Sequence, residues 1–118
     1  MKGHRDLVVW QKAMTLVTDV YEVTRGFPKD EIYGLTAQLR RAAVSVPSNL
    51  AEGHREKLKE EIPPFVGQAR GSLTKLETQL EIATNLGNLP QDVASGLLTR
   101  GSEIARMLNG LRAWSEAS

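Results

Sequence analysis

Residues 38–53, QLRRAAVSVPSNLAEG, combine hydroxyl, amide, guanidinium and carboxylate side chains at helical spacing. At about 100° per residue, one polar face of this stretch lies about 140° from its apolar face. The polar face and the two residues at its margin comprise Gln38, Arg41, Ser45, Ser48, Asn49 and Glu52. Such groups donate and accept hydrogen bonds and pair charges, so they are suited to binding a subunit or a nucleic acid.

Two interpretations of this polar face stay open: a surface in contact with water, and a subunit contact. A solvated helix face is usually rich in Lys and Glu, whereas this one uses serines and an asparagine, which are poorer helix formers. Ala37, Val44 and Ala51 also leave a shallow surface beside it, where another helix can lie. We therefore predict that the six residues form an oligomer interface.

Basic side chains offer a second chemistry, the neutralisation of phosphates. The chain has 15 Lys and Arg against 14 Asp and Glu, so a nucleic-acid surface must arise from folding and from repetition around an oligomer. The candidates for such a surface are Lys12, Arg40, Arg41, Arg55, Arg70 and Lys75. The alternative is that they form ion pairs between subunits with Glu52, Glu77 and Glu81.

Signatures of catalysis are missing from the sequence. The only histidines are His4, near the chain start, and His54, beside a glycine, and there is no cysteine. No Glu-x-x-His pair of a di-iron bundle, no phosphate-binding glycine motif and no G-x-S-x-G motif occurs. We predict a protein that is not an enzyme, with no metal, no cofactor and no small-molecule substrate.

The apolar residues recur at steps of three and four in four segments, which predicts helices. The first ends near Arg25, the second ends at Gly53, the third begins near Pro63 and Pro64, and the fourth runs from about 91 to 114. The inward residues of the first helix are predicted as Leu7, Trp10, Met14, Val17 and Tyr21, with Ala13, Leu16 and Val20 widening the face. The predicted inward residues of the second helix are Leu35, Leu39, Ala42, Val46 and Leu50. Those of the third helix are Val66, Ala69, Leu73, Leu76, Leu80 and Ala83, and those of the fourth helix are Leu97, Ile104, Leu108 and Leu111.

This pattern predicts an all-α fold, an antiparallel up-down-up-down four-helix bundle that forms a single domain over residues 1–118. Pro47 falls inside the second helix. Because Val46 has no side-chain oxygen to cap a new helix, we predict one continuous helix that is kinked at Pro47 rather than two helices. Gly67 and Gly71 are predicted to let another helix approach the third helix closely inside the bundle.

The chain also carries features that bear on location. The uncharged apolar run near the start of the chain spans only residues 7–10. This run is too short for the core of a signal peptide or for a membrane span. The absence of cysteine fits a reducing compartment. We expect a cytoplasmic protein that does not enter a membrane.

Four stretches together resemble one known family: VWQKA at 9–13, FPKDEIYGL at 27–35, QLRRAAVSVPSNLAEG at 38–53 and ARGSL at 69–73. They are similar to the four-helix bundle proteins named for intervening sequences of bacterial 23S ribosomal RNA. The resemblance implies a small bacterial protein that assembles into a ring, a homopentamer. It also implies kinship with the accessory proteins of diversity-generating retroelements, basic pentamers that bind nucleic acid and a reverse transcriptase. It implies no catalytic residues.

Two functions stay open at this point. One is a homo-oligomer associated with RNA or DNA, in which the ring repeats the basic residues around its axis. The other is a protein-binding scaffold or adaptor with no affinity for nucleic acid, which presents grooves between its helices to a partner.

Overall fold

The computed structural model describes residues 3–55 and 62–116, and these fold as helices without a strand. The four long helices are α1 (Val8–Thr24), α2 (Leu35–Arg55), α3 (Ile62–Asn85) and α4 (Gln91–Glu116). Two short 3-10 helices, η1 (His4–Asp6) and η2 (Lys29–Glu31), precede α1 and α2. The predicted all-α class with four helices is confirmed.

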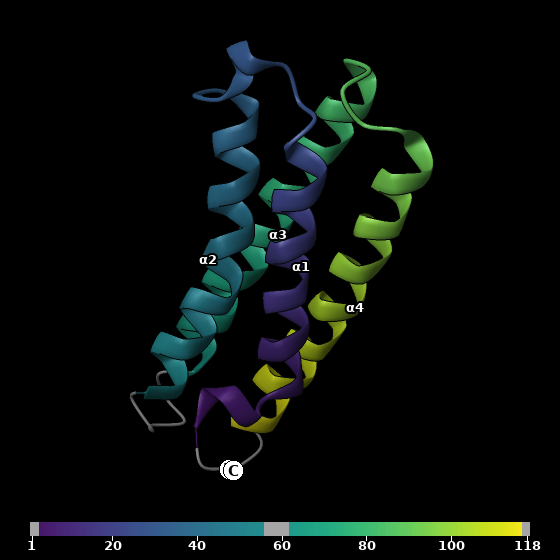
Figure 1. Ribbon diagram of the computed structural model, residues 1–118. Helices are drawn as coiled ribbons and strands as arrows, with labels where there is room; N and C mark the ends of the chain where they lie inside the picture. Colours follow the sequence, from purple (N-terminus) through teal and green to yellow (C-terminus); the bar gives the residue numbers. More distant parts are fainter. Residues whose placement is uncertain (1–2, 56–61, 117–118) are drawn as a thin grey trace.

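The helices run up, down, up and down along the long axis of the bundle, as the colours in Figure 1 show. Each helix packs against its two neighbours, so that α4 closes the bundle against α1. Two ion pairs across this closing contact, Lys12 with Glu103 and Asp19 with Arg100, require that α1 and α4 run in opposite directions. The bundle measures 47 Å by 22 Å by 20 Å.

The core confirms the predicted faces of three helices. Every predicted inward residue of α2 and α3 is buried, and in α4 Leu97, Ile104 and Leu108 are buried while Leu111 is partly buried. Gly101 is also buried on this face of α4. Because helices of similar length meet along their apolar stripes, one continuous core holds the bundle together.

The predicted inward face of α1 is partly wrong. Its buried residues are Val9, Ala13, Leu16, Val20 and Thr24, which include the residues expected only to widen the face. Two residues of the predicted stripe are instead largely exposed, Met14 at 42% and Tyr21 at 39%. The apolar arc of α1 is wider than the strip that α2 and α4 cover, so its edge stays outside the core.

The prediction that α2 continues through Pro47 is confirmed, but the prediction that it ends at Gly53 is wrong. The helix continues through the buried Pro47, as predicted, and the kink there stays a prediction. It does not end at Gly53 but runs to Arg55. A Cβ atom at Gly53 would lie 2.7 Å from Cβ of Phe65, so this glycine lets α2 and α3 approach closely rather than capping α2.

The third helix begins at Ile62, one residue before the predicted start. The expectation for Gly67 and Gly71 is wrong, because a Cβ atom at either position would meet nothing within 4 Å. The close contact of α3 therefore lies at its first turn, where Phe65 meets Gly53.

Alanine substitution should separate the crowded glycine from the open ones. We expect Gly53→Ala to lower the free energy of unfolding by about 1–3 kcal/mol, because Phe65 and α2 must move apart. Gly71→Ala, in an open helical position, should raise it by about 0.5–1 kcal/mol, since glycine disfavours the helix interior. Urea unfolding of both variants measures the difference. Equal stability of the two variants would contradict the close contact.

Candidate functional site

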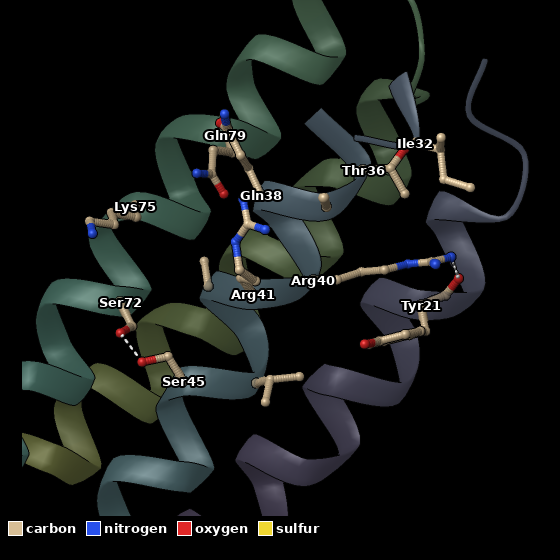
Figure 2. Close-up of a pocket in the computed structure, with 13 residues that line it drawn as sticks. Tyr21, Ile32, Thr36, Gln38, Arg40, Arg41, Ser45, Ser72, Lys75 and Gln79 are labelled. Atoms are coloured by element: carbon tan, nitrogen blue, oxygen red, sulfur yellow. Dashed lines mark hydrogen bonds between the residues drawn. The ribbon is translucent and has the colours of Figure 1, made fainter. Parts of the chain in front are cut away.

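A groove of about 1070 Å³ follows the outer face of α2, with side chains of α1 on one side and of α3 on the other (Figure 2). None of its 13 lining residues is Asp or Glu, although the whole chain is close to neutral. Figure 2 shows that the groove has two halves. The polar half, toward α3, consists of Gln38, Arg41, Ser45, Ser72, Lys75 and Gln79. The half toward α1 includes the largely apolar side chains of Tyr21, Ile32, Ala37 and Val44, and also Arg40.

One hydrogen bond between α2 and α3, and two within α2, lie at the floor of the polar half. The hydroxyl oxygens of Ser45 and Ser72 lie 2.8 Å apart. Asn49 donates from Nδ2 to Oγ of Ser45 at 2.9 Å and to the Ser45 carbonyl oxygen at 2.8 Å. Ser45 and Asn49, predicted for an oligomer interface, thus make their contacts inside one subunit, because they lie at the α3 margin of the polar face. Their part in an oligomer stays a prediction.

The other four predicted interface residues point outward. Gln38, Arg41, Ser48 and Glu52 are exposed, and the first two line the polar half. Across from Gln38, Gln79 holds a buried Oε1 atom that has no hydrogen-bond partner in the described part of the chain.

Arg41 and Lys75 are the exposed cations of the polar half. They come from different helices, α2 and α3, and residues 3–55 and 62–116 provide neither with an ion pair. Since no carboxylate lines the groove, their charges face an opening rather than a partner. Three of the six predicted phosphate-binding residues, Arg40, Arg41 and Lys75, thus line the groove, and the last two share its polar half.

Arg40 points the opposite way from Arg41, as the helical spacing predicts (Figure 2). Its Nε donates to Oγ1 of the buried Thr24 at 2.9 Å, and its Nη2 donates to the carbonyl oxygen of Tyr21 at 3.4 Å. The guanidinium also lies 4.5 Å above the centre of the Tyr21 ring. These contacts, together with the favourable position of a cation at the last turn of α1, make Arg40 a link between α1 and α2.

The remaining predicted cations lie elsewhere. Lys12 pairs with Glu103 on α4, with Nζ and Oε1 2.7 Å apart. Arg70 is exposed on α3 but does not line the groove, and the side chain of Arg55 lies outside the described residues. A nucleic-acid role for these three and for Arg40 stays a prediction.

The hydrogen bond from Lys12 and the charge of its ammonium lower the pKa of Glu103. Because the pKa of Glu103 is lower in the folded chain than in the unfolded chain, its ion pair stabilises the fold at pH values above the usual pKa of glutamate. It is lost as pH falls through the folded-state value. Both side chains are well exposed, so the effect on stability is small.

Two kinds of site are missing from the parts of the chain that the structure covers. No group of three or more His, Asp or Glu side chains in residues 3–55 and 62–116 could hold a metal ion. Among the same residues, no helix is long and apolar enough to cross a membrane.

The sequence matches the family model of the 23S rRNA-intervening sequence proteins over residues 5–110. The chain belongs to this family. A search of curated proteins finds no match to it. The matched range spans α1, α2, α3 and most of α4, and hence every residue that lines the groove of this 23S rRNA-intervening sequence protein.

Sequence reasoning did not identify Tyr21, Thr24, Ser72 and Gln79 as parts of the site. Thr24 lies four residues after the inward residue Val20, so it also faces inward. A polar residue at an inward position indicates a buried hydrogen bond, and this signal was available in the sequence. For Ser72 and Gln79 no local signal exists, because their role depends on which face of α3 lies beside α2.

Replacing each of the two neighbouring arginines should separate their roles. Arg40→Ala should lower the free energy of unfolding by about 1–2 kcal/mol, because it removes the hydrogen bond to Thr24 and the stacking on Tyr21. Arg41→Ala, which changes an exposed side chain, should stay within about 0.5 kcal/mol of the wild type. Thermal and urea unfolding measure both. A loss in Arg41→Ala as large as in Arg40→Ala would contradict this division.

Proposed function

We propose that this 23S rRNA-intervening sequence protein is a non-enzymatic bundle that assembles into a ring-shaped homo-oligomer and binds RNA or DNA. The resemblance described above implies five subunits. Arg41 and Lys75, in the polar half of the groove, are the proposed phosphate contacts. The observation that carries the proposal is the absence of any carboxylate among the residues that line this groove.

Three other cations of the described residues are already paired with carboxylates, unlike Arg41 and Lys75. Lys12 pairs with Glu103, Arg25 with Glu22 and Arg100 with Asp19. A phosphate that approached those cations would compete with a carboxylate already in place, whereas in the polar half it would meet two cations and no anion.

The neutral groups around the two cations also suit a nucleic acid. The hydroxyl of Ser45 and the amide of Gln38 can donate to phosphate and sugar oxygens, contacts that position a nucleic acid without reading its sequence. In a ring, each subunit would contribute its own polar half of the groove. The modest positive charges of the subunits would together form a basic surface.

Salt dependence of RNA binding tests the proposal. Because phosphate neutralisation releases counterions, the logarithm of the binding constant for a labelled structured RNA should fall linearly with the logarithm of salt concentration. Arg41→Ala and Lys75→Ala should each weaken binding and reduce the salt slope by about 1 for each phosphate that is no longer neutralised. Fluorescence anisotropy at several salt concentrations provides both quantities.

The matched control is Lys12→Ala, which removes an exposed cation that pairs with Glu103 outside the groove. This variant should bind RNA like the wild type. Binding that is absent or insensitive to salt, or that Lys12→Ala weakens as much as Arg41→Ala, would refute the nucleic-acid role. It would favour the alternative function, a protein-binding scaffold.

A further inference from the structure

The half of the groove toward α1 contains an aromatic ring with a guanidinium group over it. The Cζ atom of Arg40 lies 4.5 Å from the centre of the Tyr21 ring, and both residues line the groove. Figure 2 shows the side chain of Arg40 extending from α2 across to Tyr21 on α1. Tyr21 is still 39% exposed, so the pair leaves part of the ring open to a bound molecule.

Two hydrogen bonds hold Arg40 in this position, and neither of them involves the ring. Nε of Arg40 donates to the hydroxyl of the buried Thr24, and Nη2 donates to the backbone carbonyl oxygen of Tyr21. The hydroxyl of Thr24 is itself fixed, because it donates to the carbonyl oxygen of Val20 at 2.8 Å. The link between α1 and α2 therefore needs no aromatic side chain at position 21. The ring is held in advance as a flat surface, so a ligand that stacks on it loses little affinity to ordering.

The other side chains in this half of the groove are apolar. Ile32, Ala37 and Val44 line it, and Ile32 and Val44 are 54% and 39% exposed. A nucleobase is a flat group with largely apolar faces, and proteins bind unpaired bases by stacking them on aromatic rings and arginine side chains. The chemistry of this half of the groove therefore suits a base.

The two halves of the groove together match the two parts of a nucleotide. The polar half offers Arg41 and Lys75 to a phosphate, and the half toward α1 offers a ring and apolar side chains to a base. A single strand can present both parts, because its bases turn away from the backbone. In a duplex the faces of the bases are already covered by their neighbours, so the Tyr21 ring would have no partner.

We infer that the Tyr21 ring beneath Arg40 is a stacking site for an unpaired base, and that the protein prefers single-stranded nucleic acid to a duplex. The inference rests on the proposed function and names the form of nucleic acid that the groove binds. The groove of about 1070 Å³ is no smaller than typical ligand sites of about 300–1,000 Å³, so it has room for a nucleotide.

A matched single strand and duplex test the inference on the full chain. The probes are a labelled, unstructured RNA of about 12 nucleotides and the duplex that it forms with its complement. The duplex has the higher density of phosphate charge, so contacts to phosphate alone would favour the duplex. Because stacking of one base contributes a factor of about 5 to 150, we expect the single strand to bind more tightly than the duplex.

Substitution of Tyr21 should remove this preference. We expect Tyr21→Leu to weaken binding of the single strand about 5- to 150-fold and to leave binding of the duplex unchanged. The salt slope should also stay unchanged, because no phosphate contact is lost. Tyr21→Phe, which keeps the ring, should bind both probes like the wild type. Fluorescence anisotropy measures the affinities, and circular dichroism checks that each variant is folded.

A strand with abasic sites in place of its bases gives a second test that needs no change in the protein. It keeps the phosphates, so the wild type should bind it as weakly as Tyr21→Leu binds the normal strand. Tyr21→Leu should cause no further loss with the abasic strand, because the stacked base is already absent. A further loss would assign the effect of the substitution to the fold.

Tyr33→Leu is the matched control, because Tyr33 is 93% exposed and does not line the groove. This variant should bind both probes like the wild type. Equal or tighter binding of the duplex by the wild type would overturn the inference. A loss in Tyr33→Leu as large as in Tyr21→Leu would also overturn it.

The outcomes also separate this inference from the proposed function. Salt-sensitive binding that favours the duplex, and that Arg41→Ala weakens but Tyr21→Leu does not, would support the phosphate contacts and overturn the stacking site. Binding of the single strand that Tyr21→Leu weakens but Arg41→Ala and Lys75→Ala leave unchanged would support the stacking site and refute the phosphate contacts. Binding of neither probe would refute both, and would favour a protein as the occupant of the groove.

Discussion

The close packing of α2 against α3 is the constraint on which the rest of the structure depends. Gly53 allows Phe65 to contact the backbone of α2, and the hydroxyls of Ser45 and Ser72 meet two turns further along. These contacts fix the register of the two helices. Because of that register, Arg41 and Lys75 line the same half of one groove, and a slip of one turn would separate them.

The adjacent residues Arg40 and Arg41 of α2 make different contacts, because successive side chains on a helix point about 100° apart. Arg40 lies toward α1, where it stacks on Tyr21 and bonds to Thr24, and so belongs to the fold. Arg41 lies toward α3 and faces the open groove. Only the second of these two cations is free for an intermolecular contact, although both have the same chemistry.

Near-neutral net charge does not prevent the molecule from having a local positive site. Three exposed cations are already paired with carboxylates on α1 and α4. The groove beside α2 is lined by Arg41 and Lys75 and by no carboxylate, so it is a local site of positive charge.

The sequence alone determined the all-α fold, the inward faces of α2 and α3, and the continuity of α2 through Pro47, because helical periodicity and local capping chemistry are properties of short segments. Only the tertiary structure decided which part of the wide apolar arc of α1 is buried, since that depends on where α2 and α4 lie against it. It also decided that Gly53 admits Phe65, and that the hydroxyl of Ser72 bonds to that of Ser45. These are contacts between residues distant in sequence, and no local pattern encodes them.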